Sequence, residues 1–171
     1  MQKYGQQSAL VLGCGNSSVG ELLHTELGFF DVLNVDFSKA VIEHMSQKNT
    51  HTALKFVVGD VCDLGPVVKE GRCFDVAVDK GTLDSIKCCP EWQKWNMELV
   101  FVELSRVVKQ GGALFLLTRT TPDEWWTSFV QRQGWTIVAQ QEVKRQQAEA
   151  WFAPDDDYYF YVIEYCCRLP R

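Results

Sequence analysis

The chain lacks both the long apolar runs that cross a membrane and the basic surplus typical of nucleic-acid-binding proteins. Its longest apolar runs, such as Ala113 to Leu117 and Tyr158 to Ile163, have the length of a strand and fall far short of the roughly 20 residues that span a bilayer. Its 22 acidic residues outnumber its 17 basic residues, which gives a formal net charge of −5. We therefore expect neither a membrane nor a nucleic acid as a partner.

Signals for export and for metal or disulfide chemistry are also missing. Met1 to Gln7 contains one lysine and no apolar segment, so it is neither a secretory signal nor a transit peptide, and we predict a cytoplasmic protein. The seven cysteines form no C-x-x-C pair and most have apolar neighbours, so we interpret them as reduced, buried hydrophobic residues. The three histidines lack the spacing of metal ligands, and we assign no metal site.

Short apolar runs recur along a chain of 171 residues that is 46% hydrophobic and 23% charged, and we treat residues 1–171 as one globular domain. Apolar residues at helical spacing lie between the first and second of these runs and again between the second and third, which predicts a helix in each interval. A polar loop through Gly81 and Pro90 leads from the fourth run into a helix from about Glu91 to Val108, which Gly111–Gly112 ends. The runs predict five strands, residues 8–12, 32–35, 54–58, 74–78 and 113–118, of which the first has the pattern of a strand buried on both faces.

The last part of the chain predicts one more helix and a hairpin. Pro122 begins a helical segment that is rich in aromatic residues, among them Trp125 and Trp126. No helix-length pattern separates the runs Trp135 to Val143 and Tyr158 to Cys167, so these should pair antiparallel at one edge of the sheet. We predict an α/β fold: a Rossmann-like, doubly wound seven-stranded sheet of order 3-2-1-4-5-7-6, with the last strand antiparallel.

A glycine turn follows the first predicted strand, at the edge where such sheets bind ligands. Gly13 and Gly15 carry no side chain that would keep a ligand from the backbone, although tight turns also select glycine for steric reasons alone. Asp36 ends the second strand, 21 residues after Gly15, where a carboxylate can accept both hydroxyls of a ribose. Ser18 stands where the dinucleotide fingerprint has a third glycine, which disfavours NAD. A nucleoside without phosphates fits better, and S-adenosylmethionine is such a ligand.

Two further aspartates end predicted strands at the same edge. Asp60 follows the third strand, where its carboxylate could reach the adenine amino group while Val61 packs on the ring; a turn cap is the alternative interpretation. Asp79 and Lys80 end the fourth strand, and Gly81 allows a turn there. A cap or an ion pair is the alternative interpretation for Asp79, and a solvated surface lysine is the alternative for Lys80.

Four segments carry a more specific pattern: L-V-L-G-C-G-N-S at residues 10–17, V-D-F-S at 35–38, D-K-G-T-L-D at 79–84 and L-S-R-V-V-K-Q-G-G at 104–112. Together they resemble the class I methyltransferases of the elongation factor 1-alpha and citrate synthase lysine methyltransferase group. The likeness extends over about Ser8 to Thr118. The glycine turn is shared by all class I methyltransferases, whereas D-K-G-T-L-D is a narrower mark.

The resemblance implies S-adenosyl-L-methionine as cofactor, with S-adenosyl-L-homocysteine as product. It also implies a catalytic pair beside the methyl group, in which Asp79 holds and then orients the acceptor amine and Lys80 is its neighbour, with Asp84 as a second candidate contact. The cofactor-binding residues that it implies are Gly13, Gly15 and Asn16 on the methionine side, Asp36 at the ribose with Phe37 following it, Asp60 and Val61 at the adenine, and Asp79 near the methyl group.

We therefore predict an S-adenosylmethionine-dependent methyltransferase that acts by in-line transfer on the deprotonated lysine of a protein substrate, with a translation factor as one candidate. Positioning of the two reactants lowers such a barrier by roughly 7–11 kcal/mol. In the family a leading segment covers cofactor and substrate, and we expect it to be missing because only Met1 to Gln7 precede the first strand. A non-catalytic cofactor-binding or partner-binding module and a small-molecule methyltransferase therefore stay as alternatives. We expect a monomer.

Overall fold

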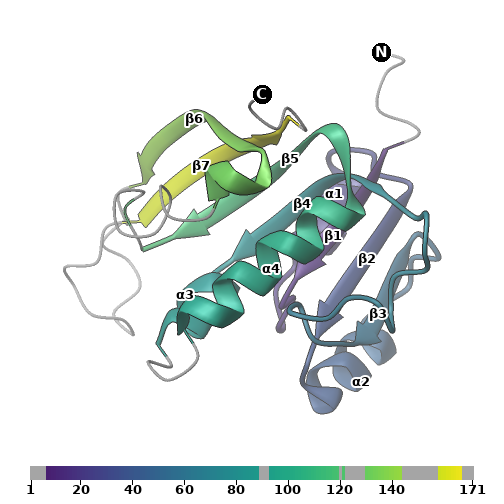
Figure 1. The fold of residues 1–171 in the computed structure, drawn as a ribbon. Coiled ribbons are helices and arrows are strands. Elements are labelled where there is room, and N and C mark those ends of the chain that lie inside the picture. The colour runs from purple at the N-terminus through teal and green to yellow at the C-terminus, as the bar shows by residue number, and fades with distance from the viewer. Residues whose placement is uncertain (1–6, 89–92, 120, 122–129, 144–157, 167–171) are drawn as a thin grey trace.

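The computed structural model describes residues 7–88, 93–119, 121, 130–143 and 158–166, and it places the seven predicted strands in one sheet (Figure 1). The order β3-β2-β1-β4-β5-β7-β6 confirms the predicted topology. β1 to β5 are parallel, and β7 runs antiparallel to both β5 and β6. The strands are β1 (Ser8–Leu12), β2 (Asp31–Asp36), β3 (Leu54–Val58), β4 (Phe74–Lys80), β5 (Val108–Thr118), β6 (Trp135–Val143) and β7 (Tyr158–Tyr165).

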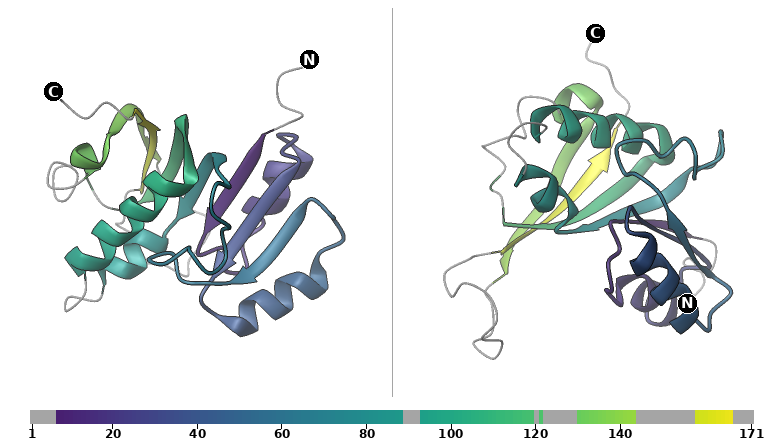
Figure 2. Two further views of the ribbon diagram at one scale, coloured as in Figure 1. Left: turned by 45° about the vertical axis from the view of Figure 1, so that its right-hand side comes forward. Right: turned by 90° about the horizontal axis from the view of Figure 1, so that it is seen from below.

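Helices cover both faces of the sheet. α1 and α2 pack on one face, against β1, β2 and β3, and α3 and α4 pack on the opposite face, against β4 and β5 (Figure 2). Ser38 caps α2 as its position predicts, because its Oγ accepts a hydrogen bond from the amide of Val41. The helices are α1 (Val19–Thr25), α2 (Lys39–Lys48), α3 (Thr82–Lys87), α4 (Gln93–Val107) and the short 3₁₀ helix Gln131–Gln133.

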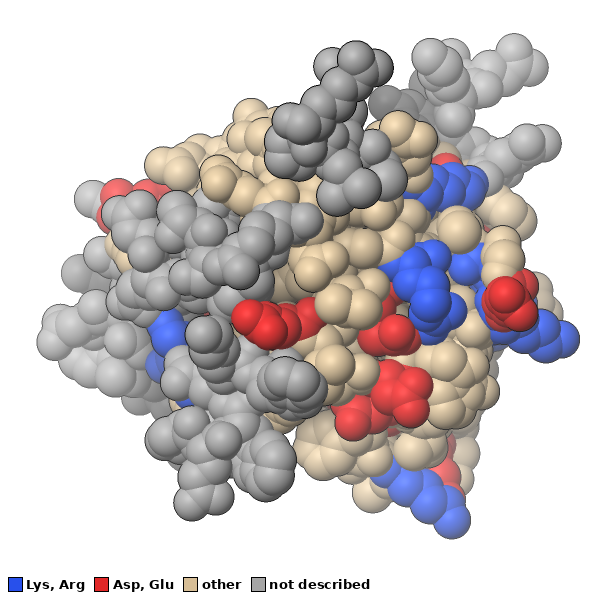
Figure 3. Space-filling view, in the orientation of Figure 1, with Lys and Arg blue, Asp and Glu red and all other residues tan. Residues whose placement is uncertain are grey.

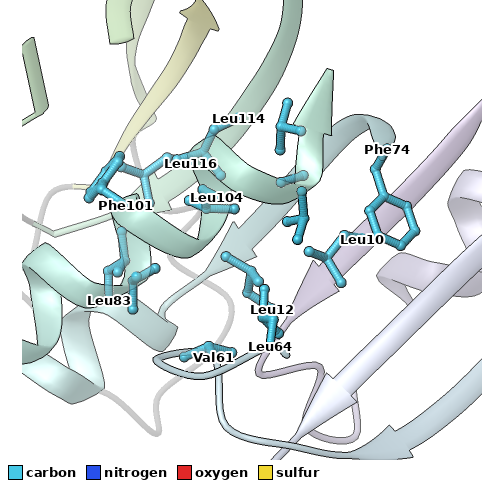
Figure 4. Close-up of a cluster of buried hydrophobic side chains, with 14 of the residues drawn as sticks. Leu10, Leu12, Val61, Leu64, Phe74, Leu83, Phe101, Leu104, Leu114 and Leu116 are labelled. Atoms are coloured by element: carbon cyan, nitrogen blue, oxygen red, sulfur yellow. The ribbon is translucent and has the colours of Figure 1, made fainter. Parts of the chain in front are cut away.

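β1 is buried along its whole length, and its alternate side chains enter two separate hydrophobic clusters. Leu10 and Leu12 belong to the larger cluster, which also contains Phe74 and lies between the sheet and α4 (Figure 4). Ala9 and Val11 belong to the smaller cluster, between the sheet and α1 and α2. Burial on both faces explains why this run is continuously apolar and shows no polar alternation.

The segment after β4 differs from the prediction, because a helix and not a polar loop follows Gly81. The side chain of Asp79 accepts hydrogen bonds from the amides of Thr82 and Leu83, which satisfies two backbone donors in the first turn of α3. Leu83 is buried in the larger cluster and anchors the helix. α3 has only six residues, too few for apolar spacing to reveal a helix in the sequence.

β5 also begins earlier than predicted. α4 ends at Val107 and the strand starts at Val108, before the two glycines. Phe74 pairs with Val108, whereas Val76 pairs with Ala113, so the register between β4 and β5 shifts. Gly111, with φ +76°, lies in this irregularity. The glycines therefore form a bulge within a strand and do not end the helix.

The cysteines fit their interpretation only in part. Cys14 is buried, but Cys62 and Cys73 are half-buried, and Cys88 and Cys166 are exposed. All five cysteines that the structure describes are free, as expected, and Cys62 packs against the larger cluster. The interpretation as buried hydrophobic residues is wrong for the exposed Cys88 and Cys166, because an apolar neighbour in sequence does not place a side chain in the core.

On the surface, acidic and basic side chains are interspersed, and acidic side chains gather near the middle of the face drawn in Figure 3. Within the described ranges, no helix combines the length and the apolar character needed to pass through a bilayer. Most of the helix predicted after Pro122, including Trp125 and Trp126, lies outside the described residues.

Candidate cofactor site

The glycine turn after β1 has a backbone conformation that requires glycine at two positions. Gly13 and Gly15 have φ values of +51° and +52°, in the left-handed region that other residues rarely adopt. The turn is fixed to the end of β2, because the amide of Cys14 donates a hydrogen bond to the carbonyl of Val35 at 3.0 Å. The sequence prediction of a glycine turn that leads into α1 is therefore confirmed.

Asp36, at the end of β2, lies directly against this turn. Its Oδ2 accepts a hydrogen bond from the amide of Gly15 at 2.8 Å, and its Oδ1 accepts one from the amide of Ser38 at 2.9 Å. A carboxylate has about four acceptor positions, so these two bonds leave about two unused, on a residue that is 7% exposed. Glycine turn and carboxylate therefore form one unit in which two hydroxyls of a ribose could bind.

A hollow of about 130 Å³ opens beside the turn. It brings three of the predicted residues, Gly13, Gly15 and Asn16, together with the exposed side chain of Lys80 from the end of β4. Its lining also includes Cys14, whose thiol pKa is raised to about 12 by burial and further by the Asp36 carboxylate, so this thiol stays protonated and unreactive. The hollow thus has a polar backbone wall and one cationic side chain.

Asp60 and Val61, the residues predicted near the adenine, follow the end of β3, beside the end of β2. Gly59 joins the two strand ends, because its amide donates to the carbonyl of Asp36 at 3.0 Å. Phe37 is 84% exposed, which leaves its ring open to stack on a ligand. Asp60 is exposed, and its Oδ1 accepts a hydrogen bond from the amide of Cys62, the turn cap that was the alternative interpretation. Val61 packs into the larger cluster with 8% of its surface exposed, so it offers little area to an adenine ring.

Asp79 and Lys80, the predicted catalytic pair, have opposite environments. The carboxylate of Asp79 is fully buried, and its two oxygens bond to the amides of Thr82 and Leu83 at 3.0 and 3.1 Å. Burial raises the pKa of the Asp79 carboxyl to about 7; the nearby carboxylate of Asp84 adds to this rise, and the bonded amides oppose it. Asp79 thus holds the first turn of α3, whereas Lys80 faces the hollow.

Two contacts of α3 were not predicted from the sequence. The hydroxyl of Thr82 donates a hydrogen bond to the carbonyl of Leu12 at 2.9 Å, which joins the end of β4 to the glycine turn. Asp84 accepts hydrogen bonds from the hydroxyl of Thr118 at 2.6 Å and from the amide of Arg119 at 3.1 Å, which joins α3 to the end of β5. The signal for Thr82 was available, since it lies in the D-K-G-T-L-D segment and β4 was predicted to neighbour β1.

Substitution of the two glycines should have unequal effects on stability. A Cβ at Gly13 would lie 2.2 Å from Oγ1 of Thr82, whereas a Cβ at Gly15 would meet no heavy atom within 4 Å. Both substitutions force a left-handed conformation on alanine, which costs about 1–2 kcal/mol. We expect Gly15→Ala to lower the free energy of unfolding by that amount and Gly13→Ala by about 1–3 kcal/mol more, because its collision adds overpacking. Urea unfolding followed by circular dichroism measures both, and equal losses would contradict the collision.

Comparison with known proteins identifies the family of the chain. The family model of the methyltransferase domain matches residues 10–116. The eEF1A lysine and N-terminal methyltransferase of Mus musculus is 28% identical over 146 residues, which cover 82% of this chain and 20% of that protein. The EEF1A lysine methyltransferase 4 of Bos taurus is 33% identical over 138 residues, which cover 75% of this chain and 52% of that protein. The chain thus spans between a fifth and about half of the length of these relatives.

Solved structures share the fold at low sequence identity. A putative methyltransferase of Haloferax volcanii, in complex with the Trm112 methyltransferase activator, has a TM-score of 0.75 and 14% identity, with 100% of this chain and 87% of that chain covered. A methyltransferase dependent on S-adenosylmethionine from Methanosarcina mazei has a TM-score of 0.70 and 15% identity, with 96% and 94% covered. The N-methyltransferase NodS of Bradyrhizobium japonicum, in complex with S-adenosylhomocysteine, has a TM-score of 0.68 and 13% identity, with 93% and 78% covered.

The residues at the glycine turn fit this cofactor. Gly13 and Gly15 leave the backbone bare beside the hollow, and Asp36 keeps acceptor positions for two hydroxyls. The family match covers well over half of the chain, and the sheet has the order predicted for this fold. The chain therefore belongs to the class I S-adenosylmethionine-dependent methyltransferases and uses S-adenosylmethionine as its cofactor.

Proposed function

We propose that this methyltransferase acts on the ε-amine of a lysine in a protein. The observation that carries the proposal is the match of 75–82% of the chain to relatives named as lysine methyltransferases of the translation factor eEF1A. The D-K-G-T-L-D segment, which contains both predicted catalytic residues, lies inside the family match of residues 10–116. A translation factor is therefore the first substrate to test.

In this proposal the glycine turn holds the methionine part of the cofactor, and Asp36 accepts the ribose hydroxyls. Phe37 and Asp60 lie at the exposed end of β2 and β3, where the adenine would be held. When bound, the cofactor supplies an electrophilic methyl group on a sulfonium, so the chain's own task is to position the acceptor and to keep it uncharged.

Lys80 and Asp79 would serve that task in different ways. A lysine amine is nucleophilic only when neutral, and a positive charge nearby lowers the pKa of a second amine. The exposed ammonium of Lys80 lines the hollow and would act on the incoming lysine in this direction. Asp79 would act from within the fold, by holding α3 and with it the chain beside Lys80.

The proposal is tested with purified eEF1A and a cofactor that carries a deuterated methyl group. We expect mass spectrometry to find the labelled methyl on a lysine of eEF1A with wild-type enzyme and no label with Asp36→Ala. A whole-cell lysate, incubated in parallel, shows whether another protein is preferred. Label confined to small molecules would contradict the proposal and favour a small-molecule substrate. S-adenosylhomocysteine binding without transfer to any acceptor would contradict it in favour of a non-catalytic module.

A further inference from the structure

Thr82, the first residue of α3, touches the cofactor turn from the neighbouring strand. Its Oγ1 donates to the carbonyl of Leu12 at 2.9 Å and lies 3.5 Å from the carbonyl of Gly13. These are the last carbonyl of β1 and the first of the turn. The contact joins residues about 70 positions apart, so it does not belong to the local structure of the turn itself.

The side chain of Thr82 also fills the space beside Gly13 that a side chain there would need. A Cβ on Gly13 would lie 2.2 Å from Oγ1 of Thr82 and 2.7 Å from its Cγ2. Both branches of the threonine therefore pack against the turn, the hydroxyl as a donor and the methyl as a wall. A β-branched side chain suits this position because its χ1 angle is restricted.

The turn's next residues are those that meet Asp36. The amide of Cys14 bonds to the carbonyl of Val35, and the amide of Gly15 bonds to Oδ2 of Asp36. Any rotation at Leu12 or Gly13 moves these amides, because the backbone between them has few soft torsions. Thr82 thus fixes the start of the segment 12–15, and the amide at the end of this segment bonds to Asp36 at the predicted ribose site.

Thr82 can hold the turn in place because the first turn of α3 is itself anchored, to Asp79 on β4 and to the end of β5. The buried carboxylate of Asp79 bonds to the amides of Thr82 and Leu83, and Leu83 is 2% exposed in the larger cluster. One residue later, Asp84 bonds to Thr118 and Arg119 at the end of β5. The threonine therefore projects onto the turn from an element that is anchored to the core and to β5.

We propose that Thr82 is a positioning residue for cofactor binding: it holds the Gly13 turn in the conformation in which the Gly15 amide meets Asp36. Without the contact, the turn samples other conformations before the cofactor arrives. If one tenth of the molecules keep the competent turn, the apparent affinity falls about tenfold, because binding must first restore that state. The role depends on the cofactor alone and not on the lysine acceptor proposed above.

Calorimetric titration with S-adenosylhomocysteine tests this role, since the ligand needs no methyl acceptor. We expect Thr82→Val, which keeps the shape and loses the donor, to raise Kd about tenfold, and Thr82→Ala to raise it at least as much. Thr82→Ser keeps the hydroxyl, and we expect it to restore Kd to within about twofold of wild type. Ser85→Ala is the matched control on the same helix, because Oγ of Ser85 bonds only to the carbonyl of Gly81 at 2.9 Å in the described contacts and should leave Kd unchanged.

Thermal unfolding of the ligand-free variants and hydrogen exchange at residues 13–16 separate positioning from stability. For a positioning role we expect faster exchange of these amides in ligand-free Thr82→Val and restored protection when S-adenosylhomocysteine is bound. A lower unfolding temperature with an unchanged Kd would overturn the proposal and leave Thr82 a structural residue. A loss of affinity in Ser85→Ala equal to that in Thr82→Val would also overturn it.

Discussion

Replacing Asp36 with alanine is expected to weaken the binding of S-adenosylhomocysteine by at least about 100-fold, or about 2.7 kcal/mol at 1.36 kcal/mol per factor of ten. The substitution removes the acceptor proposed for the ribose hydroxyls, and hydrogen bonds to a charged group contribute about 1.5–3 kcal/mol each. It also removes the partner of the Gly15 amide at 2.8 Å and of the Ser38 amide at 2.9 Å. The substitution therefore removes a support of the turn together with a contact to the ligand. Calorimetric titration with S-adenosylhomocysteine measures the resulting loss of affinity.

Asp31→Ala is the matched control, at the other end of the same strand. Asp31 forms ion pairs with Arg72 at 2.8 Å and Lys55 at 3.3 Å, far from the glycine turn. We expect its removal to lower stability slightly and to leave the affinity for S-adenosylhomocysteine unchanged. If Asp36→Ala is folded and binds the ligand within threefold of wild type, Asp36 does not hold the ribose.

The order of the sheet could be predicted because an apolar run marks each parallel strand and the first four runs end at or beside glycine or aspartate. β3 and β6 have the predicted bounds, and β2 differs by one residue at each end. The helix α3 could not be predicted in the same way. It has six residues, and its first turn is stabilised by the side chain of Asp79, which lies on the preceding strand. Apolar spacing describes what a helix buries, and it contains no information about a cap supplied from outside the helix.

The sequence predicted which residues lie at the same edge of the sheet, but it did not predict which way their side chains point. Gly15 and Asp36 were expected at the same edge, and the structure joins them by a hydrogen bond. The sequence could not indicate the direction in which a strand-end carboxylate points. Asp36 points to the turn and Asp60 to its own backbone, whereas Asp79 points into the fold and is fully buried. Thr82 was missed although the predicted pairing of β1 with β4 places it near the turn, because its contacts are with the backbone carbonyls of Leu12 and Gly13, which no side-chain pattern marks.

The buried carboxylate of Asp79 should make stability fall as the pH rises from about 4 to about 7. Its pKa is raised from 3.8 to about 7 by burial, so within this range the folded chain holds a proton that the unfolded chain has released. The free energy of unfolding therefore decreases with pH until the folded carboxyl has also ionised. Asp79→Asn cannot titrate. Relative to this variant, wild type should lose about 3 kcal/mol between pH 4 and pH 7, at 1.36 kcal/mol per pKa unit.

The difference between wild type and Asp79→Asn isolates this group, because all other carboxyls are common to both proteins. Asparagine keeps one acceptor for the amides of Thr82 and Leu83, so the lost cap bond shifts the difference by a constant and leaves its pH dependence intact. Asp75→Asn, on the same strand, provides a control of opposite sign. Burial alone would raise the pKa of Asp75, but its bonds to Lys109 and Ser8 outweigh this and lower it, so its stabilisation is present at neutral pH and is lost in acid. Urea unfolding at steps of one pH unit measures all three proteins, and parallel curves for wild type and Asp79→Asn from pH 4 to pH 8 would show that the Asp79 carboxyl is not protonated in the fold.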